Sequence, residues 1–168
     1  MISIFFIMFL YLVNSKYIYK KTLSTPFNSQ KKTEDFLKSK KFIDSYLKKV
    51  NAKNITFKPE LKKYAEYPFT INYNTIPRLG NIPNNLEFNI EQNWSKKDNL
   101  LIGNVKSKIL EFGLKLSYEK VNNTINIHID SEIIKKSFYL PSHVLKSAVD
   151  DFCNILTDLM NNSLCFYF

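Results

Sequence analysis

The chain has 168 residues, of which 45% are hydrophobic, 15% aromatic and 23% charged, and it contains three glycines. These proportions indicate one globular domain with a sizeable core, and they exclude collagen-like and coiled-coil proteins. The formal charge of +9 comes from 24 basic residues against 15 acidic ones. Lys, Asn and Ile are all abundant, as in the products of AT-rich genomes, so this charge is weak evidence for a nucleic-acid partner.

The chain opens with a run of large apolar residues between residues 2 and 13, and residues 1–15 contain no charged side chain. The run is shorter than the roughly 20 residues that a membrane-spanning helix needs. It is typical of the hydrophobic core of a secretory signal peptide, with Val13 and Ser15 as small residues before the cut. We therefore predict a signal peptide over residues 1–15, with a buried strand or an uncleaved anchor as alternatives.

Residues 16–33 contain five lysines, several hydroxyl side chains and no acidic residue. This composition is typical of a transit peptide, and we predict a basic transit-like segment. A signal peptide followed by such a segment resembles the bipartite leader that sends proteins along the secretory route to a secondary plastid such as the apicoplast. A basic spacer on a secreted protein is the alternative. Without these five lysines the charge falls from +9 to +4, so we expect no nucleic-acid partner.

Residues 34–162 are predicted to form one α+β domain, followed by an apolar tail at 163–168. A helix is expected at 33–50, because apolar residues recur there at helical spacing. The elements that follow are two short strands, a loop rich in Pro and Asn, and an antiparallel meander whose strands alternate apolar with polar residues. Gly103 is expected to mark a bulge or a close approach. The expected ranges are strands 55–58 and 67–73, loop 75–85, and strands 86–91, 100–109, 112–119 and 125–130.

The chain then continues into a long helix beginning near Pro141. Apolar residues recur at spacings of three and four from Val144 to Met160, while Lys146, Asp150 and Asp158 lie off this stripe. A stripe of this kind has to be buried against another element, and the dry face of the meander is the available partner. The sequence therefore predicts a curved antiparallel sheet gripping a long C-terminal helix.

This arrangement resembles the helix-grip fold of the START and polyketide-cyclase-like (SRPBCC) superfamily. More narrowly, residues 42–160 are similar to an uncharacterised START-like domain family of cyanobacteria and plastids. The resemblance rests on five stretches of sequence. It implies a hydrophobic cavity between sheet and helix, and it implies no catalytic residue. The stretches are Leu100-Leu101-Ile102-Gly103, the 112–118 and 125–134 strands, Phe138-Tyr139-Leu140-Pro141 and the helix beginning Val144-Leu145.

The best candidates for a catalytic pair are His128 and Asp130, which share one face of a strand because they are two residues apart. The alternation places them opposite the isoleucines of that strand, on the solvent side, where a hydrogen-bonded surface pair is the alternative. Cys153 is expected to be a buried thiol on the last helix. The sequence contains no CxxC pair, Cys/His cluster or glycine-rich phosphate loop, so we predict no metal site and no cofactor.

A pocket for a hydrophobic ligand is the more plausible site, because such pockets are mainly apolar with a few orienting polar groups. Tyr118 or Trp94 is expected to supply the polar group, and the same residues would also suit a filled core. The candidate lining residues are Phe88, Ile90, Leu114, Leu116, Tyr118, Ile125, Ile127, Phe152 and Ile155.

The sequence thus favours non-enzymatic binding of a lipid, a pigment or another hydrophobic small molecule in a plastid-type organelle. The alternative is a structural or assembly protein with a solid core, which binds a protein partner through an exposed aromatic patch formed by Tyr64, Tyr67, Phe69 and Tyr73. A cyclase-like enzyme using His128 is the third hypothesis. The lysines between residues 48 and 63 are expected to form a solvated face, and any membrane contact is expected to be transient.

Overall fold

The computed structural model describes residues 16–76, 87–108, 110–135 and 142–163, which form seven strands and three helices. Predictions for residues 1–15, for Pro141, for most of the 75–85 loop and for residues 164–168 of the tail lie outside these ranges. No helix in the described ranges is long and apolar enough to span a membrane. In chain order the elements are β1 (Lys16–Ser24), α2 (Gln30–Leu37), α3 (Lys40–Lys49), β2 (Lys53–Lys58), β3 (Phe69–Thr75), β4 (Phe88–Lys97), β5 (Leu100–Lys106), β6 (Leu110–Val121), β7 (Thr124–Lys135) and α4 (Ser142–Ser163).

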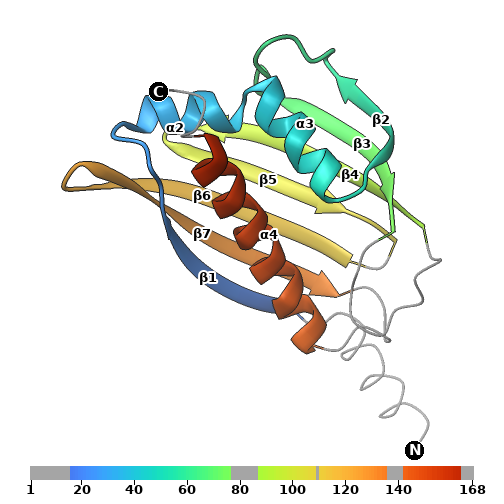
Figure 1. The fold of residues 1–168 in the computed structure, drawn as a ribbon. Coiled ribbons are helices and arrows are strands. Elements are labelled where there is room, and N and C mark those ends of the chain that lie inside the picture. Colours follow the sequence, from blue (N-terminus) through green and yellow to red (C-terminus); the bar gives the residue numbers. More distant parts are fainter. Residues whose placement is uncertain (1–15, 77–86, 109, 136–141, 164–168) are drawn as a thin grey trace, which may run out of the picture.

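The strands form a single antiparallel sheet in the order β1-β7-β6-β5-β4-β3-β2 (Figure 1). Strands β2 to β7 are a meander in which each strand pairs with the next one along the chain. Strand β1 closes the far side by pairing with β7, from Lys16 opposite Ile134 to Ser24 opposite Asn126. The sheet curves around α4. Helices α2 and α3 lie on the same side of the sheet as α4, near its C-terminal end (Figure 1). The predicted α+β fold, a curved antiparallel sheet gripping a C-terminal helix, is confirmed.

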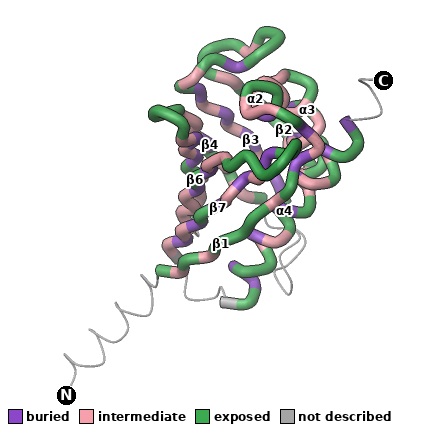
Figure 2. The backbone as a smooth tube through the Cα atoms, turned by 90° about the vertical axis from the view of Figure 1, so that its left-hand side faces the viewer, coloured by how far each residue is buried: buried purple, intermediate pink, exposed green. Residues whose placement is uncertain are grey.

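Alternation along the strands separates a dry concave face from a wet outer face. On β7, Ile127 and Ile129 are at most 1% exposed, whereas Asp130 between the inward positions is exposed. In Figure 2 buried and exposed segments alternate along the sheet, and the helices pack on one side of it. Because successive side chains of a strand point to opposite faces, this pattern follows directly from the sequence.

Helix α4 has 22 residues, which gives a rod of roughly 33 Å. Its apolar stripe is buried against the concave face of the sheet, as predicted. Leu145 and Val149 are each 1% exposed, and Met160 at the other end is fully buried. Cys153 lies on the same stripe as a free, buried thiol, and burial raises its pKa above the ordinary value.

The single helix expected at 33–50 is in fact two helices, α2 and α3, separated at Lys38 and Ser39. Ser39 caps α3, since its hydroxyl accepts a hydrogen bond from the Phe42 backbone N–H at 3.2 Å. The break is held by a neighbouring segment: the Ala65 N–H donates to the Lys38 carbonyl at 2.7 Å, and the Lys40 N–H donates to the Lys63 carbonyl at 3.0 Å. The apolar spacing alone could not reveal these tertiary contacts.

The N-terminal boundary of the domain also differs from the prediction. Residues 16–24 are an edge strand of the sheet, and the chain that follows is packed into the fold, with Phe27 8% exposed and Thr33 fully buried. The fold therefore includes residues 16–33, which we predicted to precede the domain. A targeting role for residues 16–33 is a separate matter and stays a prediction.

Candidate functional site

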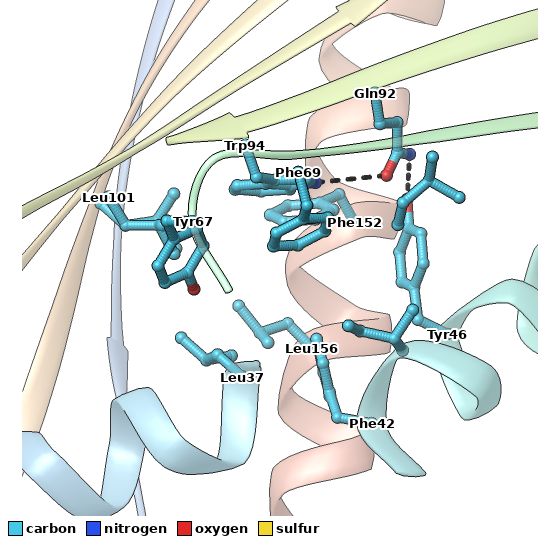
Figure 3. Close-up of a pocket in the computed structure, with 13 residues that line it drawn as sticks. Leu37, Phe42, Tyr46, Tyr67, Phe69, Gln92, Trp94, Leu101, Phe152 and Leu156 are labelled. Atoms are coloured by element: carbon cyan, nitrogen blue, oxygen red, sulfur yellow. Dashed lines mark hydrogen bonds between the residues drawn. The ribbon is translucent and has the colours of Figure 1, made fainter. Parts of the chain in front are cut away.

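A mainly apolar cavity lies between the concave face of the sheet and all three helices (Figure 3). It sits where the two hydrophobic clusters of the core meet, and both clusters pack against Phe42, Tyr67 and Trp94. Its walls contain no charged side chain. They are formed by Leu37 of α2; Phe42, Ile43 and Tyr46 of α3; Tyr67, Phe69 and Ile71 around β3; Gln92 and Trp94 of β4; Leu101 of β5; Leu116 of β6; and Phe152 and Leu156 of α4.

The cavity is small in this structure, with a volume of about 50 Å³. That is room for about four water molecules, whereas pockets for drug-sized ligands span roughly 300–1,000 Å³. Aromatic rings occupy most of the remaining space. The Phe152 ring meets the Tyr46 ring edge-on at 6.2 Å between centroids, and Phe42 stacks against Tyr46 at 6.5 Å. These rings close the cavity on its helical side.

Trp94 forms one wall because Gly103, its partner on the next strand, leaves room for the indole ring. A Cβ atom placed on Gly103 would lie 2.5 Å from Trp94 Cζ3, well inside the 3.5–4.0 Å at which carbon atoms normally touch. The prediction that Gly103 marks a close approach is therefore confirmed. The indole of Trp94, which we predict to supply a polar group, lines the cavity.

One end of the cavity is polar but uncharged. Gln92, which is 3% exposed, donates from Nε2 to the Tyr73 hydroxyl at 2.7 Å and to the Tyr46 hydroxyl at 3.5 Å. The Trp94 Nε1–H donates in turn to Gln92 Oε1 at 3.5 Å (Figure 3). Burial raises the pKa of both tyrosines above the ordinary value, so they stay neutral at physiological pH. The network fixes the orientation of the Gln92 amide.

A second polar group lies outside the lining set but close to the lining residue Tyr67: the hydroxyl of Tyr118, which is buried and has no hydrogen-bond partner among the described residues. Burial raises the pKa of Tyr118, and the nearby Tyr67 adds to this effect. Burial likewise raises the pKa of Tyr67, a cavity-lining residue, and Glu34 contributes to both shifts. A buried hydroxyl without a partner costs about 1–3 kcal/mol. Its predicted role as the polar group that orients a ligand stays a prediction.

The structure brings only part of the predicted pocket together. Leu116 and Phe152 line the cavity. Leu114, Ile125 and Ile127 face the same concave surface and are fully or almost fully buried in the core. Phe88, Ile90, Tyr118 and Ile155 are half-buried and also lie outside the lining set.

The cavity lies nearer to β3 and β4 than the sequence predicted. The prediction did not include the lining residues that α2, α3 and β3 contribute. The predicted 67–73 strand did contain a usable signal. Phe69 and Ile71 alternate with Thr70 and Asn72, as residues of the meander strands do, and together with Tyr67 they line the cavity.

His128 and Asp130 lie on the outer face of the sheet, away from the cavity. His128 is bonded to the Glu119 carboxylate at 2.9 Å and to the Thr22 hydroxyl at 3.0 Å, and Asp130 lies 3.8 Å from the Lys20 ammonium. The expected solvent-side placement of this pair is confirmed. In the ranges that the structure describes, no group of three or more His, Cys, Asp or Glu side chains could hold a metal ion.

The exposed aromatic patch required by the structural-protein hypothesis is not formed. Tyr64 is 42% exposed, but Phe69 and Tyr73 are 7% and 5% exposed, and Tyr67 is half-buried against the core. The reason is strand alternation: Phe69 and Tyr73 both point to the concave face of β3.

Comparison with solved structures identifies the architecture. The fold of Ara h 8.0201 matches with a TM-score of 0.62 at 10% identity, over 90% of this chain and 99% of that one. The chain has the helix-grip fold. Ginseng major latex-like protein 151 from Panax ginseng matches with a TM-score of 0.59 at 6% identity, over 88% of this chain and 97% of that one. Norcoclaurine synthase from Thalictrum flavum, solved with dopamine and hydroxybenzaldehyde, matches with a TM-score of 0.56 at 8% identity. The match covers 94% of this chain and 91% of that one.

These neighbours are Bet v 1-like helix-grip proteins. At such low identity they establish the fold of this chain and nothing finer. No family model and no curated protein matches the sequence. The helix-grip architecture is thus shown, while the narrower similarity to a family of cyanobacteria and plastids stays a prediction.

Proposed function

We propose that this helix-grip protein binds a hydrophobic small molecule, such as a lipid or a pigment, in the cavity beneath its helices. The observation that carries the proposal is the cavity itself, which is walled by apolar and aromatic side chains on the concave face of the sheet. Norcoclaurine synthase, which shares the fold, was solved with two small aromatic molecules bound. Binding would draw its free energy from the burial of apolar surface, about 25 cal/mol per Å².

The polar groups around the cavity define the chemistry of the ligand. The lining set carries no charge, and the tyrosines on which Gln92 is anchored are neutral. A charged group buried here would be unpaired and costly. The proposed ligand is therefore neutral within the cavity and carries a hydrogen-bonding group that reaches Tyr118 or the Gln92 amide.

A ligand larger than a few atoms must displace the aromatic rings that now close the cavity. Phe42 and Phe152 come from different helices, so a small separation of α3 from α4 would enlarge the space between them. The energy of this opening subtracts from the affinity. Binding is therefore expected to be weaker for bulky ligands than for slender ones of equal apolar area.

The second candidate function is a solid-core structural protein that binds a partner through its surface. The observation in its favour is the small volume of about 50 Å³. The experiment described next distinguishes ligand binding from a solid core.

The test uses Trp94, the single tryptophan of the chain, which lines the cavity and so reports on it directly. Protein beginning at Lys16 is purified gently, analysed by native mass spectrometry, and extracted with organic solvent. A co-purifying apolar molecule near one-to-one, whose removal changes Trp94 emission, supports the proposal. A Leu116→Trp substitution fills the cavity and should abolish retention of that molecule. The solid core would be favoured if no molecule co-purifies with the protein and if Trp94 emission stays unchanged when lipids or pigments are added.

We also propose that the protein acts in a plastid-type organelle reached through the secretory route, with secretion as the alternative. The support is the apolar segment at 1–15 and the acid-free basic segment at 16–33. A fluorescent reporter fused to residues 1–33 should reach the plastid, and one fused to residues 1–15 should only be secreted. Retention of the longer fusion in the endoplasmic reticulum would exclude this proposal.

A further inference from the structure

Two lysine-rich segments meet at the corner between α2 and α3. The backbone hydrogen bonds from Lys40 to Lys63 and from Ala65 to Lys38 fasten the 62–65 segment to the break between the two helices. Five lysines that are distant in sequence are thereby gathered around the exposed ring of Tyr64. This lysine corner consists of Lys38, Lys40, Lys41, Lys62 and Lys63.

The charge of this corner is only partly neutralised. Lys38 pairs with Asp35 and Lys40 with Asp44, both at 2.9 Å. Within the described ranges Lys62 and Lys63 form no ion pair, and both side chains are exposed. The lysine corner therefore presents a net positive surface to the solvent.

The rest of the chain shows that this excess is local. Residues 30–66 contain eleven lysines against five acidic residues, whereas residues 67–163 contain ten basic and ten acidic residues. A genome bias towards Lys codons would raise both regions alike. Strand β1 adds three more lysines, but each of them pairs with an acidic residue of β7 or α4. An excess without acidic partners therefore remains in the α2–α3 layer and the segments that pack beside it.

Tyr64 adds an aromatic group at the centre of the corner. It is 42% exposed, and the ammonium groups of Lys63 and Lys38 lie 5.5 and 5.8 Å from the centre of its ring. An exposed tyrosine flanked by lysines is suited to the interface between lipid headgroups and hydrocarbon, where amphipathic rings concentrate.

A groove of about 770 Å³ opens beside Tyr64, between the α2–α3 corner and the end of α4. Phe36, Phe42 and Leu159 give it apolar walls, and Lys40, Lys41 and Lys63 lie on its rim. Phe42 also lines the ligand cavity, so the groove and the cavity share this side chain. The positive corner and the apolar groove form one continuous surface.

We propose that the lysine corner docks on an anionic lipid surface, with Tyr64 at the interface and the groove facing the bilayer. Charge complementarity supplies the attraction, at about a fivefold gain in affinity for each lysine near such a surface. The apolar groove favours lipid over nucleic acid, which offers no hydrocarbon to such a wall. If the protein binds an apolar ligand as proposed above, docking would also give that ligand a route from the bilayer to the cavity. The docking proposal itself does not depend on the proposed function.

The test measures co-sedimentation of the full chain with vesicles of phosphatidylcholine, with and without phosphatidylglycerol, over a range of salt concentrations. Residues 1–15 carry no charged side chain and contribute equally to both vesicle types. We expect preference for the anionic vesicles, weakened by salt, and an affinity loss of roughly twentyfold in Lys62→Gln/Lys63→Gln. The control Lys97→Gln/Lys115→Gln removes two exposed lysines from the outer face of the sheet and should bind like the unmodified chain.

Three outcomes would overturn the docking proposal. They are equal binding to both vesicle types, equal losses in the two double variants, and corner-dependent binding of a DNA or RNA oligonucleotide with no binding to vesicles. Ligand retention is measured separately through Trp94 emission. Vesicle docking without ligand retention would count against the proposed function alone, and ligand retention without docking would count against this inference alone.

Discussion

Replacing Gly103 with alanine probes the wall of the cavity with a single methyl group. The new Cβ would lie 2.5, 2.7 and 2.8 Å from three carbon atoms of the Trp94 indole. Because carbon atoms normally touch at about 3.5–4.0 Å, the ring has to move by about 1 Å. It moves into the cavity, which has a volume of about 50 Å³, and this weakens its contact with Gln92.

The expected cost can be compared with that of the same substitution on the neighbouring strand. Overpacking a core position costs about 1–3 kcal/mol. At Gly113 the nearest atoms to an added Cβ are at 3.7 Å, an ordinary contact, so Gly113→Ala should gain roughly 0.5–1 kcal/mol from a stiffer unfolded chain. Gly103→Ala gains as much from the unfolded chain, so the two variants should differ by the overpacking cost of about 1–3 kcal/mol in free energy of unfolding.

Thermal unfolding and Trp94 fluorescence check this prediction together. For a chain of this size each kcal/mol shifts Tm by roughly 2–4 °C, so Gly103→Ala should melt about 2–12 °C below Gly113→Ala. The emission of Gly103→Ala should also differ from that of the unmodified protein, while Gly113→Ala leaves it unchanged. Equal Tm values with identical emission in the two variants would refute the packing of Trp94 on Gly103.

Four further predictions address the core, the helix break, the tyrosines and the N-terminal strand. Leu116→Ala should lower the free energy of unfolding by about 3 kcal/mol, and the enlarged cavity should take up benzene-sized probes, detected by Trp94 emission. Ser39→Ala removes the cap of α3 and should cost about 1 kcal/mol in urea unfolding, whereas Ser39→Asp should retain most of the stability. The pKa of Tyr67 and Tyr118 is raised in the folded protein. The unfolded chain therefore loses these protons first, and stability should fall as the pH rises above about 10, with no such loss below it. Protein beginning at Lys16 should unfold cooperatively, and protein beginning at residue 34 should not, because it lacks β1 and the buried Phe27.

The parts of the fold that the sequence predicted are those specified by nearby residues. The α4 stripe repeats over many turns, and the strands of β6 and β7 alternate around a two-residue turn at Asn122 and Asn123. In each case the side chains that share a face lie within a few residues of one another. Pattern and structure therefore coincide without knowledge of the rest of the chain.

The parts that were missed depend on contacts between distant segments. Strand β1 turns Tyr17 and Tyr19 towards the core, but the exposed Ile18 between them hides the alternation, and the five lysines of residues 16–33 are more typical of a targeting segment. Its partner is β7, at the other end of the chain. The helix break at Ser39 and the position of the cavity both depend on the packing of the 62–71 segment against α2 and α3. The spacing of apolar residues along the chain does not specify which distant segments contact one another.

The position of β1 has a consequence for how the chain folds during its synthesis. Ser24 bonds to Asn126, a residue 102 positions later, so at about 5–20 residues per second the strand waits roughly 5–20 s for its partner to leave the ribosome. The meander can meanwhile pair locally, which favours its folding first. The waiting strand would expose Tyr17 and Tyr19, and its interspersed lysines oppose pairing with other chains. Strand β1 is thus expected to join the sheet after the meander has formed.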